Sequence, residues 1–376
     1  MKKNDIIKNE EKDEKKNNEI ENTIEESNIN IENIPKPNTS GFFTLSYKNG
    51  DKFTGQIDNG SVNSFGIYQQ SNGLSFECDF GQKSNDKNIK LKGKLIFDNG
   101  KSIYEGEFLN GKFDGKGTLL NSNGDIYEGN FKNGLKEGEG IFLFSEGDKY
   151  IGSFSKNNFE GEGQLIIKDI SEYKGYFKNG KYEGYGVLKS LINKEVLMGY
   201  FKNGKINGKG IQIFPSNDSY DGNFKDGKFD GYGVYNFANG DKYEGNFSEG
   251  YIHGKGELKY ENGDKYIGNF EKGEKCGKGT FYFGDKNVYE GEFLKDKFHG
   301  EGVLFKGNGD MIEGHFENGL IKGKATFYPN NGIPYDINTE EDVDEENDIN
   351  ENINENSEMN YDDQTTCDNT NSNIKI

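Results

Sequence analysis

The chain contains no arginine and no tryptophan, so lysine supplies all 46 of its basic residues. Arginine carries the planar fork that contacts a phosphate group or a guanine edge through two parallel hydrogen bonds. Its absence argues against sequence-specific recognition of DNA or RNA. We therefore predict no nucleic-acid partner.

Cysteine and long apolar runs are scarce as well. Cys78, Cys276 and Cys367 are odd in number and far apart, which argues against a disulfide framework and against a zinc site. No stretch approaches the roughly 20 apolar residues that a membrane-spanning helix needs, and the N-terminus has no apolar signal core. These features predict a cytoplasmic protein that is not secreted and has no transmembrane segment.

Hydrophobic residues make up only 31% of the 376 residues, which is low for a conventional globular core. The two ends explain part of this deficit. Residues 1–40 are rich in Lys, Glu and Asn, and residues 336–376 hold 14 Asp and Glu against one Lys. Segments of this kind bury too little apolar surface to fold. We expect disordered tails at 1–40 and 336–376 on either side of an ordered region at 41–335.

Glycine is abundant, at 54 residues, and it is periodic. Units that resemble Tyr-x-Gly-x-Phe begin every 23 residues, with one step of 24, and their first residues are Tyr104, Tyr127, Tyr150, Tyr173, Leu197, Tyr220, Tyr243, Tyr266, Tyr289 and Ile312. A second pair of glycines follows within the unit, as at Gly115 and Gly117. Weaker units precede these at Phe53 and Phe76, and a half unit follows at Tyr335. A fixed period of this length indicates a repeat array.

Each unit predicts two short strands, because its aromatic and glycine positions alternate along the chain. Pairs such as Asn110-Gly111 and Asn203-Gly204 are typical of two-residue hairpin turns. The predicted fold is all-β, an elongated single-layer antiparallel β-meander of the order of 115 Å at about 4.8 Å per strand. With no second layer, a ring is shielded only by lying along the sheet, and a glycine leaves the floor on which it rests.

Segments such as "YEGEFLNGKFDGKG" and "YDGNFKDGKFDGYG" resemble MORN repeats, and the resemblance covers about residues 41–335. It implies an elongated ribbon that is not enzymatic by itself, is often dimeric, and serves as a scaffold at membranes and cytoskeletal structures. Proteins with such repeats include protist division scaffolds, radial-spoke head proteins and some plant phosphatidylinositol phosphate kinases. The Asn-rich, arginine-free composition resembles that of proteins from AT-rich protist genomes.

The sequence offers little for catalysis. A phosphate-binding loop needs Gly-x4-Gly-Lys-Ser/Thr between a strand and a helix, and neither the spacing nor the helix is present. His253 and His299 occupy the same position two repeats apart, too far to share a metal ion. We predict no enzyme activity, no cofactor and no metal site.

Two surfaces are candidate interaction sites. The first is a lysine edge at the hairpin turns, made of Lys178, Lys181, Lys202, Lys205, Lys225 and Lys228. The second is an aromatic partner groove, made of Tyr104, Phe108, Tyr127, Phe131, Tyr220, Phe224, Tyr243, Phe247, Tyr266, Phe270, Tyr289 and Phe293.

These surfaces support a non-enzymatic scaffold that organises a cytoskeletal or membrane-associated protein assembly, with proteins as partners. The alternatives are an adaptor that binds phosphoinositides or other anionic lipids through the lysine edge, since each Lys near an anionic leaflet adds about 1 kcal/mol, and a regulator in trans of a phosphatidylinositol phosphate kinase. Whether the chain forms a homodimer is left open.

One unit departs from the pattern. It begins with Leu197 and Met198 in place of Tyr-Glu, and the preceding segment has an extra residue and no glycine turn. A change of twist or a partner contact is compatible with this departure, and sequence drift is the interpretation we favour.

Overall fold

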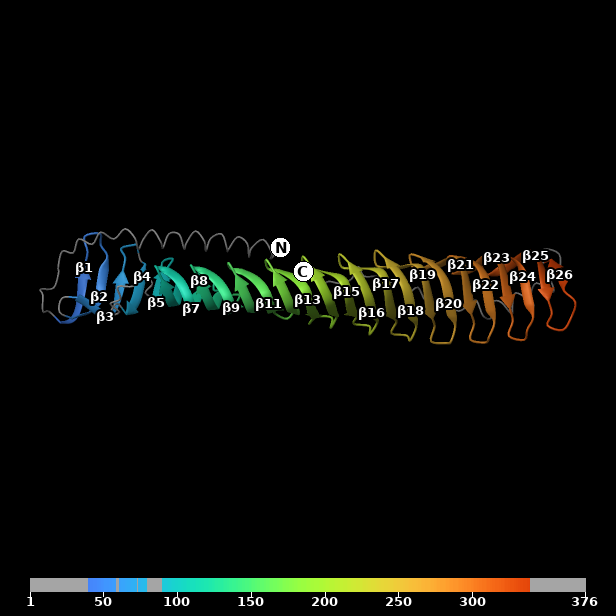
Figure 1. The fold of residues 1–376 in the computed structure, drawn as a ribbon, viewed down its shortest axis with the longest axis horizontal. Coiled ribbons are helices and arrows are strands. Elements are labelled where there is room, and N and C mark those ends of the chain that lie inside the picture. The colour runs from blue at the N-terminus through green and yellow to red at the C-terminus, as the bar shows by residue number, and fades with distance from the viewer. Residues whose placement is uncertain (1–39, 59–60, 73, 80–89, 339–376) are drawn as a thin grey trace. The chain divides into compact units, whose positions relative to one another are not determined.

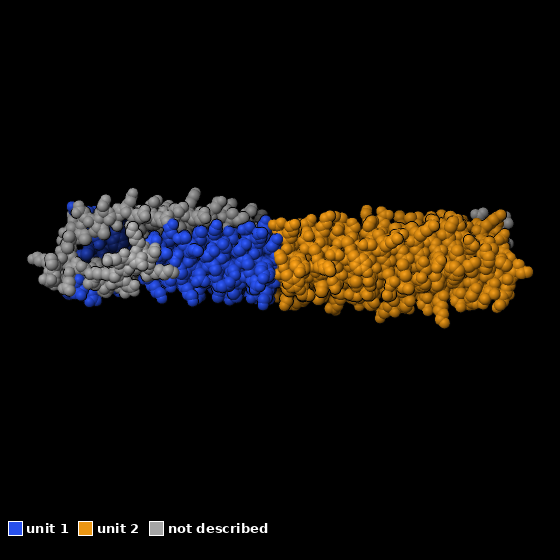
Figure 2. Space-filling view, in the orientation of Figure 1, with its two compact units in different colours: residues 1–183 blue, residues 184–376 orange. Residues whose placement is uncertain are grey.

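The computed structural model describes residues 40–338, apart from 59–60, 73 and 80–89. The chain divides into two compact units, residues 1–183 and 184–376, drawn blue and orange in Figure 2. Both expected tails lie almost wholly outside the described residues. Residues 336–338 are an exception, because they belong to the last strand. The last strand therefore extends three residues beyond the predicted boundary at residue 335.

The described residues form strands and no helix (Figure 1). Those of the first unit are β1 (Gly41–Ser46), β2 (Lys52–Asp58), β3 (Ser61–Gln69), β4 (Ser75–Asp79), β5 (Lys90–Phe97), β6 (Ser102–Leu109), β7 (Lys112–Leu120), β8 (Ile126–Lys132), β9 (Leu135–Leu143), β10 (Lys149–Ser155), β11 (Asn158–Ile167) and β12 (Ser171–Lys178). Strand β13 (Lys181–Ser190) contains the boundary between the units. Those of the second unit are β14 (Val196–Lys202), β15 (Lys205–Ile213), β16 (Ser219–Lys225), β17 (Lys228–Asn236), β18 (Lys242–Ser248), β19 (Tyr251–Lys259), β20 (Lys265–Glu271), β21 (Glu274–Tyr282), β22 (Val288–Leu294), β23 (Lys297–Phe305), β24 (Met311–Glu317), β25 (Leu320–Tyr328) and β26 (Tyr335–Asn338).

Within each unit, every strand pairs antiparallel with the strands that precede and follow it in sequence. This holds from β1 to β12 and from β13 to β26. The predicted all-β antiparallel meander, with two strands to each repeat, is confirmed.

The hairpin turns have the geometry that their Asn-Gly pairs predict. Asn203 has φ 52° and Gly204 has φ 85°, and Asp226 and Gly227 have 50° and 91°. Two consecutive residues with positive φ define the turn whose twist matches that of the flanking strands.

The first Tyr of the repeat is completely buried wherever it occurs, at Tyr104, Tyr127, Tyr150, Tyr173, Tyr220, Tyr243, Tyr266 and Tyr289. Tyr220 shows why. A Cβ atom added to Gly233, on the neighbouring strand, would lie 2.6 Å from Cε2 of the Tyr220 ring. The ring therefore rests directly on glycine, as the sequence predicted. Phe229 stacks on its other side with ring centroids 3.7 Å apart, so the core is a row of rings along the sheet.

The phenol group of the same Tyr donates a hydrogen bond to the backbone at the β-bulge beside it. The register of β16 and β17 shifts between Gly222 and Phe224, which leaves Asn223 out of the ladder. The hydroxyl of Tyr220 donates a hydrogen bond to the carbonyl oxygen of Asn223 at 2.8 Å. The equivalent bond, three residues along the chain, occurs in all eight tyrosine repeats at 2.8–3.1 Å. One side chain thus fills the core and pairs a backbone carbonyl that the bulge exposes.

Successive repeats are joined at both ends of the hairpins. At one end, the Gly227 amide donates to the Ile206 carbonyl, 21 residues earlier, at 3.0 Å. At the other end, the carboxylate of Asp264 accepts a hydrogen bond from the Gly284 amide, 20 residues later, at 2.8 Å. We call these the inter-repeat contacts. Further carboxylate contacts of the second kind start from Asp51, Asp125, Asp148, Asp218, Asp241 and Asp310.

In two repeats the first residue is not Tyr, and the packing on the glycines changes accordingly. In the repeat that begins at Leu197, Ile206 takes the place of the ring: its Cδ1 lies 3.2 Å from where a Cβ of Gly199 would be. In the last repeat, Ile312 replaces Tyr, and Ala325 stands where the other repeats have the second glycine. A shorter side chain above the sheet leaves room for a methyl group in its floor.

Candidate functional site

The twelve aromatic residues predicted to line a partner groove form the core. Each of them is at most 4% exposed: Tyr104, Phe108, Tyr127, Phe131, Tyr220, Phe224, Tyr243, Phe247, Tyr266, Phe270, Tyr289 and Phe293. The physical reason is the side chain nine residues after the Tyr, such as Phe229, which covers the ring from the side away from glycine. The rings are therefore not an accessible groove, and a partner would have to meet other residues.

The lysine edge lies at the surface. Lys178, Lys181, Lys202, Lys205, Lys225 and Lys228 are all exposed. In the second unit, Lys202 pairs in register with Lys205, and Lys225 with Lys228, so each pair flanks one hairpin turn.

This edge is not purely basic. Lys228 Nζ lies 2.8 Å from the carboxylate of Glu249, which belongs to the following turn. Lys228 and, more weakly, Lys225 hold the pKa of the Glu249 carboxyl below its usual value. Because both side chains of the ion pair are exposed, it adds little to stability. It does reduce the positive charge that the edge presents.

Sequence reasoning missed two buried lysines. Lys136 and Lys275 occupy the position of the covering residue, where other repeats have Phe, Tyr or Ile. The Lys275 ammonium lies 3.1 Å from Asp296 Oδ1 and within 6 Å of the Tyr260 and Tyr266 rings. Burial lowers the pKa of Lys275, and the charge of Asp296 opposes this shift.

Each buried lysine is matched by a change in the next repeat. The turn glycine of the other repeats is replaced there by Asn157 or Asp296, at φ 72° and 68°. The Lys136 amide donates to the Asn157 side-chain oxygen at 2.8 Å, and the Lys275 amide donates to Asp296 Oδ1 at 2.9 Å. Comparison of corresponding positions across the repeats would have revealed this coupling from the sequence.

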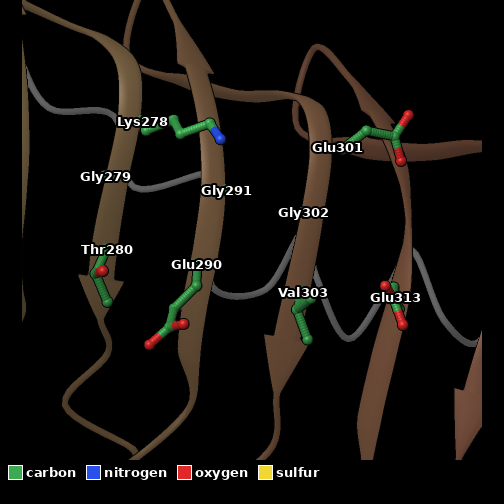
Figure 3. A pocket seen from close by; sticks show the side chains of 9 residues that line it. All are labelled: Lys278, Gly279, Thr280, Glu290, Gly291, Glu301, Gly302, Val303 and Glu313. Carbon is green, nitrogen blue, oxygen red and sulfur yellow. The ribbon is translucent and has the colours of Figure 1, made fainter.

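A hollow of about 500 Å³ lies on the face of β21–β24 opposite the rings (Figure 3). Gly279, Gly291 and Gly302 form its floor, and the carboxylates of Glu290, Glu301 and Glu313 surround it together with Lys278, Thr280 and Val303. His315 Nδ1 lies 3.0 Å from the Glu301 carboxylate. The hollow offers negative charge to solvent, and its charged side chains belong to outward positions of the repeat.

In residues 40–338, outside the gaps, no helix is long and apolar enough to cross a membrane.

Repeated β-hairpins with a tyrosine on a glycine floor define a class of protein, the β-meander repeat proteins. The sequence model of the MORN repeat matches ten consecutive segments of the chain: residues 104–126, 127–149, 150–169, 173–190, 198–219, 220–242, 243–265, 266–288, 289–311 and 313–333. The chain belongs to the MORN repeat family. Modules of this family are typically non-enzymatic scaffolds that bind proteins or membranes.

No curated protein matches the chain. Among solved structures, the TCP domain of Drosophila melanogaster SAS-4, in complex with a proline-rich motif of Ana2, is 14% identical, with a TM-score of 0.22 over 54% of this chain and 86% of that one. A mutant of the TCP10 domain of Danio rerio CPAP is 10% identical, with a TM-score of 0.18 over 60% and 92%. An inactive virginiamycin B lyase from Staphylococcus aureus is 12% identical, with a TM-score of 0.12 over 82% and 88%. Likenesses this weak carry no argument about function.

Proposed function

We propose that the chain is a non-catalytic scaffold that organises a cytoskeletal or membrane-associated protein assembly. The observation that carries the proposal is the contrast between the two faces of the sheet. The ring-on-glycine packing and the inter-repeat contacts recur from repeat to repeat, whereas the outward residues change. A constant frame with a variable surface is suited to holding several partners at fixed spacing.

The twelve ring residues belong to the frame, so the partner surface must be sought among outward side chains. Proximity labelling with the full chain in its own cells, combined with mass photometry of the purified chain, tests the proposal. We expect recurrent cytoskeletal or membrane-associated protein neighbours. Only monomers in solution, together with no such neighbours in cells, would overturn it.

The lysine edge supports a second candidate function, an adaptor for phosphoinositide-containing or other anionic membranes. Its support is the exposure of all six lysines at hairpin turns, two pairs of which lie on successive hairpins of the second unit. Each lysine near an anionic surface contributes about 1 kcal/mol, and Glu249 subtracts from this sum.

Liposome flotation distinguishes the two functions. The full chain is compared with a variant in which all six edge lysines are changed to Glu, and with the control Lys255→Glu/Lys278→Glu, whose sites are exposed on outward strand positions. Flotation that needs phosphoinositide and fails only in the edge variant supports the adaptor. Equal flotation of all three chains, or none, removes it. An assay of a phosphatidylinositol phosphate kinase with and without added chain tests regulation in trans.

A further inference from the structure

The outward face of three neighbouring strands, β13–β15, carries a group of residues that we call the outer patch. It consists of Tyr185, Val187, Lys189, Val196, Met198, Tyr200, Lys209, Ile211 and Ile213. The register places Tyr185 beside Tyr200, Val187 beside Met198, and Met198 beside Ile211. Seven of the nine side chains are apolar or aromatic, two are lysine, and none is acidic.

The patch is open to solvent. Tyr185 is 49% exposed, Tyr200 is 53% exposed, and their rings meet edge to face with centroids 5.6 Å apart. Ile213 is 41% exposed, and Ile192, in the turn between β13 and β14, is 71% exposed. Contiguous apolar surface of this kind marks an interaction site more often than scattered exposed residues do.

The patch is not a general property of the repeat. The corresponding outward positions of β19–β21 are Lys255, Glu257, Lys259, Lys265, Ile267, Asn269, Lys278, Thr280 and Tyr282, of which only two are apolar or aromatic. The patch centres on the repeat that lacks the Tyr-Glu start. The departure at Leu197 and Met198 therefore coincides with a change in surface chemistry.

The charges of the patch indicate its occupant. Lys189 and Lys209 are exposed, and neither forms a salt bridge with a described residue. A second copy of the same patch would bring two more lysines and no carboxylate to pair with them. A fitting occupant combines apolar side chains with carboxylates. The chain itself contains such a segment, residues 355–363, "ENSEMNYDD", with Met359 and Tyr361 among four acidic residues.

The chain is long enough for this segment to reach the patch. Strands β15 and β26 are eleven strands apart within the second unit, which is about 53 Å at about 4.8 Å per strand. An extended chain covers that distance in about 16 residues at roughly 3.4 Å each. Counted from the end of β26 at Asn338, the residues from about 354 onward are therefore within reach.

We propose that residues 355–363 dock on the outer patch of the same chain. Met359 and Tyr361 contact Tyr185, Tyr200 and Ile213, and the carboxylates of the segment lie near Lys189 and Lys209. The docked segment covers this apolar part of the outward face and competes with any partner that uses it. The docking concerns regulation of the surface and does not depend on which partners the scaffold holds.

The test uses the full chain throughout. Hydroxyl-radical footprinting compares the wild-type chain with the tail variant Met359→Ser/Tyr361→Ser, which keeps every charge. We expect oxidation of Met198 and Tyr200 to rise several-fold in the variant. Tyr232, equally exposed at 53% but on β17 outside the patch, serves as the internal control and should not change.

Zero-length carbodiimide cross-linking provides the second readout, with Lys255 as the control lysine. The proposal predicts cross-links from Lys189 and Lys209 to carboxylates of 355–363 within monomers, and their loss in the variant Tyr185→Ser/Tyr200→Ser/Ile213→Ser. Unchanged footprints in the tail variant would overturn the proposal. So would equal changes at Tyr232, which indicate an effect that is not confined to the patch, or cross-links found only in dimers, which indicate a second copy as the occupant.

Discussion

The contact between the tyrosine ring and its glycine floor gives the sharpest prediction, because a single methyl group should disrupt it. Gly233 lies outside the positive-φ region and is buried beneath Tyr220, so Gly233→Ala adds no backbone strain. The new Cβ would lie 2.6 Å from Cε2 and from the hydroxyl oxygen of Tyr220, and 2.7 Å from its Cζ. The ring must therefore move away from the strand.

The expected loss of stability follows from what the ring loses. Overpacking a filled core costs about 1–3 kcal/mol. A displaced phenol also gives up its hydrogen bond to Asn223, worth about 1 kcal/mol. We predict that Gly233→Ala destabilises the fold by about 2–4 kcal/mol. The control Tyr232→Ala, at an exposed site on the same strand, should change stability by about 0.5 kcal/mol or less.

The last repeat suggests how to separate ring displacement from other causes. There Ile312 takes the position of the Tyr and Ala325 takes the position of the second glycine, so Tyr220→Ile should relieve Gly233→Ala. Urea unfolding of the two single variants and the double variant gives a coupling energy, which we expect to favour the double variant by at least about 1 kcal/mol. Additive effects, or a Gly233→Ala chain as stable as the wild type, would refute the packing argument.

Three further predictions concern buried polar groups. Asp296→Gly leaves the Lys275 ammonium buried without its carboxylate and should lower the free energy of unfolding in urea by about 3 kcal/mol. The double variant Lys275→Phe/Asp296→Gly has the residue types of other repeats and should recover that stability. A single variant as stable as the wild type would contradict this. Burial raises the pKa of six repeat tyrosines well above 10, namely Tyr104, Tyr127, Tyr150, Tyr173, Tyr266 and Tyr289. Their protons are kept in the folded state and lost from the unfolded chain above about pH 10, so stability is full below that pH and falls above it by up to about 1.4 kcal/mol per tyrosine and pH unit. Tyrosinate absorbance should thus rise together with loss of circular dichroism, and ionisation near pH 10 with the fold intact would count against deep burial. Asp264→Ala removes the acceptor of the Gly284 amide and should speed hydrogen exchange at that turn, with no change expected in distant repeats.

Much of the fold could be predicted because the same sequence pattern recurs in each repeat. The period fixed the strands, the Asn-Gly pairs fixed the hairpin turns, and the alternation of Tyr220, Gly222 and Phe224 placed the rings on glycine. The error about the aromatic groove arose from the covering residue. The sequence analysis predicted that each ring lies on glycine but did not identify the residue that covers its other side, which is Phe229 or its equivalent.

The surface was harder to predict because outward residues follow the period less strictly than the rings and the glycines do. The lysine edge was found since it recurs in three successive units, although its ion pair to Glu249 was not foreseen. The outer patch and the coupling of Lys275 with Asp296 were missed. Both require comparing the same position across repeats and asking where it departs from the rule, and the departures depend on neighbours that only the register brings together.

The inter-repeat contacts join the repeats to one another and make a constant frame for a variable surface. Residue-resolved hydrogen exchange of the full chain tests this at the turns. The account predicts that the amides of Gly227, Gly250, Ala238 and Gly284 are protected like strand amides, because each donates to a neighbouring repeat. Exchange of these four amides at the rate of an unstructured peptide would contradict it.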